Sequence, residues 1–193
     1  MANSKSGIIT PDFVRLVRHE FALDWNGIHG ARHWARVRGN GLRLASVNGA
    51  DTRVVEYFAF LHDVKRDNDG HDPGHGARAV RLAESFRGGL VQLEDEEFDM
   101  LCDACRYHSD GRTEAPVTVQ TCWDADRLDL GRVGIRPDPR RLCTEEGKAP
   151  EIIEWAYERS LADLISSRSS DRLLLRAEAA HHRIEVERVD ELR

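Results

Sequence analysis

A nearly unbroken apolar run, Val54-Val55-Glu56-Tyr57-Phe58-Ala59-Phe60-Leu61, places the strongest constraint on the fold of this chain. A helix with so few polar positions is buried rather than lying on the surface. The run leads directly into His62 and Asp63, and a buried ionised aspartate is costly unless it is paired or bound to a metal. The segment therefore predicts both a buried helix and a partner or metal ion for Asp63.

Apolar side chains recur at helical spacing along most of the chain, so an all-α fold with no sheet of more than two strands is expected. Thr10 and Asp72 are expected to cap two of the helices, each followed by a proline at the first helical position, Pro11 and Pro73. No internal repeat is found. The expected helices cover about residues 11–21, 31–46, 51–65, 73–86, 94–108, 117–130, 150–166 and 171–193.

The length of 193 residues is that of one domain, or of one domain with an appendage. The net charge of −6 argues against a nucleic-acid partner. No apolar stretch approaches the length needed to cross a bilayer, and the N-terminus has no apolar signal core. A cytoplasmic protein is therefore expected, with Cys102 and Cys105 as buried thiols rather than as a zinc or redox site.

Two further segments carry polar residues that suit a divalent metal. His33 precedes Val37 by one helical turn, which places its imidazole next to the core, and Asp126 lies among apolar neighbours. Histidine and aspartate from separate helices can converge on one ion, and such donors suit Mn²⁺, Fe²⁺, Co²⁺, Ni²⁺, Zn²⁺ or Mg²⁺. The alternative is that each is an ordinary buried residue with a hydrogen-bond partner.

The combination of these motifs resembles the HD superfamily of metal-dependent phosphohydrolases. The chain contains His33-x-x-Arg-Val, then Phe58-x-x-x-His-Asp, then Asp124-Ala-Asp-Arg-Leu-Asp, and the resemblance covers about residues 28–135. It implies an HD-domain helical bundle over 10–145, with a C-terminal helical appendage over 146–193 that packs on the domain or mediates a homodimer. It also implies four metal ligands, with the Ala-Asp-Arg segment favouring Asp126 over Asp124: His33, His62, Asp63 and Asp126.

Two more histidines suggest a second ion. His75 and His108 lie between the His-Asp pair and the final aspartate, as two histidines do in dinuclear members such as HD-GYP phosphodiesterases and the myo-inositol oxygenase type. The resemblance then implies that Asp63 bridges the two metals. The chain lacks the Gly-Tyr-Pro segment, so cleavage of cyclic dinucleotides is not implied. Alternatively, both histidines serve the substrate or proton transfer beside a single ion.

Phosphate recognition requires cations. Arg66 is the first candidate for holding the substrate phosphate, followed by Lys65 and Arg36. Among the loop histidines, His71 is favoured over His29 for a contact with phosphate, and His71 or His108 could protonate the leaving group. Arg127 is expected to turn away from Asp126 and to pair with a neighbouring acid.

The expected activity is the hydrolysis of a phosphomonoester or phosphodiester in a nucleotide or other small molecule. Water activated by one or two metals would attack phosphorus, with Asp63, Arg66 and His71 as the catalytic residues. Two alternatives remain: a di-iron oxygenase that shares the ligand set, and a regulatory module that binds a partner through the C-terminal helices. Bound iron with oxygen-dependent turnover, or metal-independent binding without turnover, would distinguish them.

Overall fold

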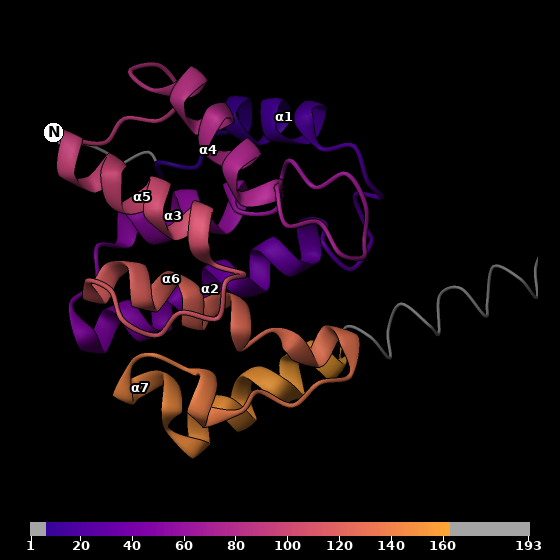
Figure 1. The fold of residues 1–193 in the computed structure, drawn as a ribbon, viewed down its shortest axis with the longest axis vertical. Coiled ribbons are helices and arrows are strands. Elements are labelled where there is room, and N and C mark those ends of the chain that lie inside the picture. Colours follow the sequence, from indigo (N-terminus) through magenta and orange to yellow (C-terminus); the bar gives the residue numbers. More distant parts are fainter. Residues whose placement is uncertain (1–6, 163–193) are drawn as a thin grey trace, which may run out of the picture.

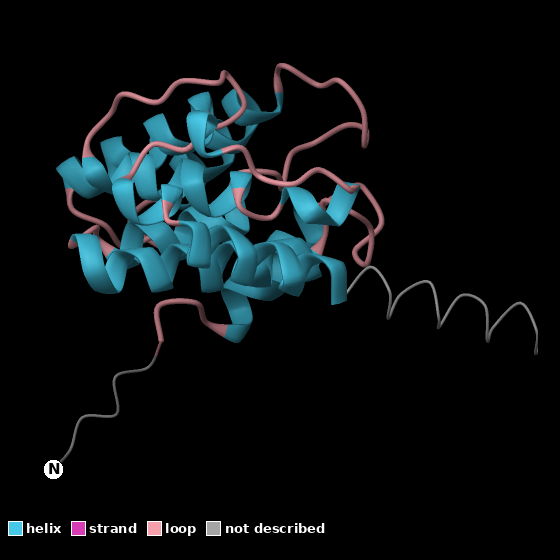
Figure 2. Ribbon diagram, turned by 90° about the horizontal axis from the view of Figure 1, so that it is seen from below, coloured by secondary structure: helices cyan, strands magenta, loops and turns pink. Residues whose placement is uncertain are grey.

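The computed structural model describes residues 7–162 and consists of helices joined by loops (Figures 1 and 2). The only β-pairing within these residues is an isolated bridge between Arg87 and Val91. The predicted all-α fold is therefore confirmed. The helices are α1 (Pro11–Glu20), α2 (Ala31–Asn48), α3 (Thr52–Leu61), α4 (His75–Phe86), α5 (Asp95–Tyr107), α6 (Val117–Arg127), the 3₁₀ helices η1 (Leu130–Val133) and η2 (Pro139–Arg141), and α7 (Glu145–Lys148), followed by a helix over 150–162.

Side-chain caps explain where several helices begin. The Thr10 hydroxyl accepts a hydrogen bond from the Phe13 amide at 3.2 Å, as predicted for the start of α1. Asp51 caps α3 in the same way, and Glu94 and Glu97 form a reciprocal capping box at the start of α5. Within residues 7–162, no helix combines the length and the apolar composition that crossing a membrane requires.

The predicted buried helix is α3, which packs against α2, α5 and α6. Val54, Phe58 and Leu61 on this helix are fully buried. Because α3 has neighbours on several sides, the residues that follow its last turn are delivered to the interior of the bundle. This arrangement places His62 and Asp63 among residues from other helices rather than at the surface.

Two glycines let the helices approach closely where the polar residues gather. A Cβ atom at Gly41 in α2 would lie 2.5 Å from Val55 of α3 and 3.3 Å from Ala125 of α6. A Cβ atom at Gly76, near the start of α4, would lie 2.4 Å from the carbonyl oxygen of Cys105 in α5. The contacts with Val55 and with the Cys105 carbonyl are well below normal contact distance, so a side chain at either glycine would push the helices apart.

Several helix boundaries differ from the prediction, among them the end of α3 and the start of α4. α3 ends at Leu61 instead of continuing to residue 65, because the chain tightens into turns in which the Val64 amide bonds to Leu61 O and the Arg66 amide to Asp63 O. The cap of α4 is Gly74 rather than Asp72. The Asp72 carboxylate instead accepts hydrogen bonds from the Asp67 amide and from Arg78, and so holds the preceding loop.

The helix over 150–162 packs on the bundle through a second, smaller apolar cluster. Ile153 and Ala156 of this helix meet Leu44 of α2, Leu128 and Leu142. The described part of the C-terminal segment is thus packed against the helical domain. The proposed division at residue 145 and the homodimer stay predictions, and the last expected helix, 171–193, lies outside the described residues.

Candidate metal centre

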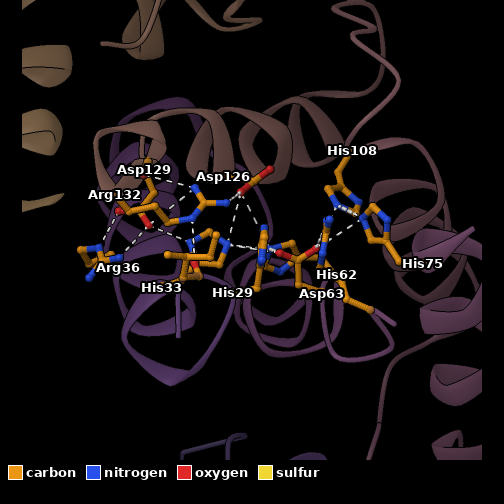
Figure 3. A network of polar contacts seen from close by, with 12 residues as sticks. His29, His33, Arg36, His62, Asp63, His75, His108, Asp126, Asp129 and Arg132 are labelled. Carbon is orange, nitrogen blue, oxygen red and sulfur yellow. Dashed lines mark hydrogen bonds and ion pairs between the residues drawn. The ribbon is translucent and has the colours of Figure 1, made fainter. Parts of the chain in front are cut away.

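Donor atoms from three segments converge at the end of α3. The Nε2 atoms of His33, from α2, and His62 lie 3.1 Å apart, and each lies 3.6 Å from Oδ2 of Asp63 (Figure 3). The third segment is the end of α6, where Oδ1 of Asp126 lies 3.4 Å from the His33 nitrogen and 3.8 Å from the His62 nitrogen. All four residues that the sequence singled out for a first ion are therefore neighbours.

A second group lies on the other side of Asp63. Nε2 of His75, the first residue of α4, and Nε2 of His108, at the end of α5, lie 2.8 Å apart. They lie 3.3 and 3.5 Å from Oδ1 of Asp63. The two carboxylate oxygens of Asp63 thus face different pairs of imidazoles, which is the arrangement that a carboxylate shared by two cations needs (Figure 3).

A hydrogen bond at Nδ1 fixes the ring orientation of each of the four histidines. In each ring Nδ1 faces an oxygen that can only accept, so Nδ1 carries the proton. The distances are 2.7 Å from His33 to Asp129 Oδ2, 3.1 Å from His62 to Phe58 O, and 2.8 Å from His108 to Cys105 O; His75 bonds to Asp72 O. In the neutral rings the unprotonated Nε2 lone pairs then point at one another, which is repulsive unless a cation or a proton lies between them.

Asp129 connects this centre to the rest of the bundle. Its carboxylate accepts bonds from His33, from Arg36 Nε and Nη2 at 2.6 and 3.0 Å, and from the Ser160 hydroxyl at 2.9 Å. Burial opposes the ionised form, but His33 and Arg36 outweigh it and lower the pKa of Asp129 to about 2. An ionised Asp129 keeps the Nδ1 proton of His33 in place and leaves its Nε2 lone pair free for a cation.

Burial and neighbouring charges shift the pKa values of the residues at the centre in different directions. Burial lowers the pKa of His62 to about 3 and lowers the pKa of His75. Burial opposes the charged form of His108 as well, but the Asp63 carboxylate beside it raises the pKa of that ring. Burial opposes ionisation of Asp63 and Asp126, yet charge interactions with the neighbouring residues, chiefly His62, hold both pKa values below the usual range.

One buried atom of the centre lacks a conventional partner. Within the described part of the chain, no hydrogen bond reaches Oδ1 of Asp63, although this atom is buried. Ligands bound at about 2.1 Å to one ion lie about 3.0 to 3.4 Å from one another, and the closer donor separations here are similar. Two groups could hold an ion: His33, His62 and Asp63, and Asp63, His75 and His108. The donor set therefore fits divalent cations.

Of the residues predicted to bind the substrate, only some lie at the centre. Arg66 lies at the centre, with Nη1 3.5 Å from Asp63 Oδ1, and its other nitrogens donate to the carbonyls of the 68–70 loop. Lys65 instead pairs with Glu20 of α1 at 3.3 Å. Arg36 is buried behind His33, where it holds Asp129. His71 is exposed in the loop before α4.

Two residues at the centre received little or no weight from the sequence. His29 is buried, its ring lies 6.4 Å from that of His33, and its Nδ1 lies 2.9 Å from Asp69. Arg132 lies 3.9 Å from Asp126 Oδ1 and donates to the carbonyl of Ile28. His29 lies four residues before His33, and this spacing was the one available signal. Because His29 was expected in a loop, helical spacing could not be used to place it beside His33. Nothing in the local sequence marks Arg132.

A cavity of about 940 Å³ opens beside the centre. His108 and Asp126, one from each side of Asp63, contribute to its lining. The cavity thus gives a bound molecule access to the residues that face both candidate ion positions. Its volume lies at the upper end of the range typical of small-molecule sites, about 300 to 1,000 Å³.

Comparison with solved structures identifies the fold. A predicted HD superfamily hydrolase from an uncultured Thermotogales bacterium superposes with a TM-score of 0.60 at 23% sequence identity, covering 87% of this chain and 92% of that one. The chain has an HD-domain fold. No protein-family model matches the sequence, and no curated protein matches it either. At the level of the fold, the resemblance found in the HD motifs is confirmed.

Proposed function

We propose that this protein is a metal-dependent phosphohydrolase that acts on a small phosphate ester. The observation that carries the proposal is the orientation of the four buried histidines. Each Nδ1 is bonded to an acceptor, and the four Nε2 atoms surround the two oxygens of Asp63. A buried set of imidazole and carboxylate donors is chemically matched to divalent transition metals.

We assign the first ion to His33, His62, Asp63 and Asp126, and a second ion to Asp63, His75 and His108. When bound, a divalent cation at such a site lowers the pKa of a coordinated water toward neutrality and polarises a phosphoryl oxygen. A bridging role for Asp63 is supported by the two imidazole pairs that face its two oxygens.

Arg66 is the cation that we assign to the substrate phosphoryl group. Its guanidinium lies beside Asp63, where a charged oxygen of the substrate would also lie, and arginine suits phosphate because it donates two parallel hydrogen bonds. Contacts of Lys65 or Arg36 with the substrate would require them to leave Glu20 or Asp129, so we do not assign them a direct role.

His71 remains our candidate proton donor to the leaving group. It is exposed, and the loop that carries it is held in place from two sides. His29 bonds to Asp69, and Arg66 bonds to the carbonyls of Asn68 and Gly70. The loop therefore holds the backbone around His71 in place, and we assign proton donation to the exposed ring.

The test is a phosphate-release assay on a panel of small phosphomonoesters and phosphodiesters. The purified protein is first stripped with a chelator and then reloaded with Mn²⁺, Fe²⁺, Co²⁺, Ni²⁺, Zn²⁺ or Mg²⁺ in turn. We expect turnover that depends on metal and that His62→Ala abolishes. Iron-specific oxygen consumption without phosphate release would contradict hydrolysis and favour the di-iron oxygenase, which can use the same donors.

A further inference from the structure

The cavity beside the centre is larger than a phosphoryl group requires. Its volume is about 940 Å³, and His108 and Asp126 form only a small part of its lining. Further along, the lining comes from η1, the loop after it and η2. If the proposed function holds, the phosphate lies at the end with His108 and Asp126, so the remaining volume is available to the body of the substrate.

The walls of this cavity combine apolar and cationic side chains. Leu130 and Ile135 contribute apolar surface, and 54% of Ile135 is exposed although it is a large aliphatic residue. Arg127, Arg136 and Arg141 contribute positive charge. Apolar walls with a few placed polar groups are typical of small-molecule sites. The lining thus matches a ligand that has both an apolar body and negative charge.

The three arginines differ in how far their charge is already neutralised. Arg136 pairs with Glu154. Arg127 was expected to pair with an acid, but its guanidinium donates to the carbonyl oxygens of Arg141 and Arg112 and contacts Cys143 Sγ. These carbonyl oxygens lie beside the end of α6, within reach of the guanidinium. Among residues 7–162, the charge of Arg127 is therefore hydrogen-bonded but not neutralised by a carboxylate.

Arg141 is the arginine best placed to meet a ligand. It is exposed, it ends η2, and within residues 7–162 its guanidinium forms no ion pair. Its backbone is fixed because its carbonyl accepts the Arg127 bond at 2.8 Å. Of the acidic residues in the lining, Asp126 belongs to the proposed metal centre and Asp138 is already bonded to Arg140. The charge of Arg141 therefore remains available.

We propose that this cavity binds the body of a phosphate ester that carries a second anionic group, and that Arg141 binds that second group. This inference rests on the proposed function for the position of the first phosphate. Arg127 adds positive charge beside Arg141 from a fixed position, because its guanidinium is held by the carbonyl oxygens of Arg141 and Arg112. The second group lies away from the scissile phosphate, so the protein selects substrates with two separated anionic groups.

The test compares two ligands that differ by one phosphate, adenosine 5′-monophosphate and adenosine 3′,5′-bisphosphate. Calorimetry on the metal-loaded full chain measures binding, and a parallel assay measures phosphate release. The variants are Arg141→Gln and, as a control, Arg81→Gln, which removes an exposed arginine from α4 outside the cavity lining. Both changes remove one positive charge from the surface, so the net charge falls equally.

We expect the wild type and Arg81→Gln to bind the bisphosphate at least tenfold more tightly than the monophosphate. Arg141→Gln should weaken binding of the bisphosphate about tenfold and leave the monophosphate within about twofold. Equal binding of both ligands by the wild type, or equal weakening of both by Arg141→Gln, would overturn the inference. Selective binding of the bisphosphate without phosphate release would support the inference and contradict hydrolysis. Phosphate release without selective binding would support hydrolysis and overturn the inference.

Discussion

At the scale of single residues, the orientation of the proposed metal ligands depends on residues that would not contact the metal themselves. Asp129 holds the Nδ1 proton of His33 and is itself held by Arg36 and Ser160. The sequence indicated the ligand candidates, because histidine and aspartate beside apolar residues are costly without a partner. It could not identify Arg36 or Ser160 as partners of Asp129, since these contacts join residues about 30 or more positions apart.

Asp129→Asn should lower metal affinity about 10- to 100-fold, the usual effect of removing the group that orients a metal-binding histidine. The amide keeps the shape but offers His33 and Arg36 a neutral partner. Asp124→Asn is the matched control, because Asp124 lies three residues from the end of α6 and, among residues 7–162, its carboxylate accepts hydrogen bonds from Cys143 and Thr144 alone. Calorimetric metal titration of both variants measures the effect. Equal affinities in the two variants would contradict the role of Asp129.

At the scale of helices, close packing at two glycines brings the two histidine pairs together. Gly41 allows α2 to approach α3 and α6, and Gly76 allows α4 to approach α5. The helices themselves followed from periodicity and caps, but these approaches did not. A glycine inside a helical pattern looks like a weak position until its neighbours are known. The end of α3 at Leu61 was missed for a similar reason, because tertiary contacts decide where a helix tightens into a turn.

Gly76→Ala should weaken the second metal position selectively. The added methyl group would meet the Cys105 carbonyl, so α4 has to shift and His75 moves relative to His108. The overpacking should also cost about 1–3 kcal/mol of stability. Gly39→Ala is the control, since its Cβ would meet only the flexible end of Arg159, at 3.0 Å. Metal content by elemental analysis should fall for Gly76→Ala alone; a wild-type content would show that the contact at Gly76 does not set the second position.

At the scale of the whole molecule, the centre joins elements that are distant in sequence. Donor atoms come from α2, the end of α3, the start of α4, the end of α5 and α6, and the helix over 150–162 adds Ser160 behind them. The sequence predicted this convergence only through the HD resemblance. It gave His29 little weight and did not reveal Arg132, because a contact between a loop and η1 cannot be obtained from helical spacing.

Metal removal should therefore destabilise the whole domain, because facing imidazole lone pairs lose the cation between them. A ligand that binds the folded state alone at a hundred times its Kd stabilises it by about 2.7 kcal/mol. Thermal unfolding should show a higher Tm for the metal-loaded protein than for the chelated one, and a smaller difference in His62→Ala. An unchanged Tm after verified metal loading would show that the centre contributes nothing to holding the helices together.

Metal titration of the wild type against His75→Ala and His108→Ala tests the central claim most directly. The claim is that Asp63 lies between two cation positions, with Oδ2 toward His33 and His62 and Oδ1 toward His75 and His108. The account predicts about two equivalents of metal in the wild type and about one in each variant. One equivalent in the wild type, unchanged by either substitution, would contradict it.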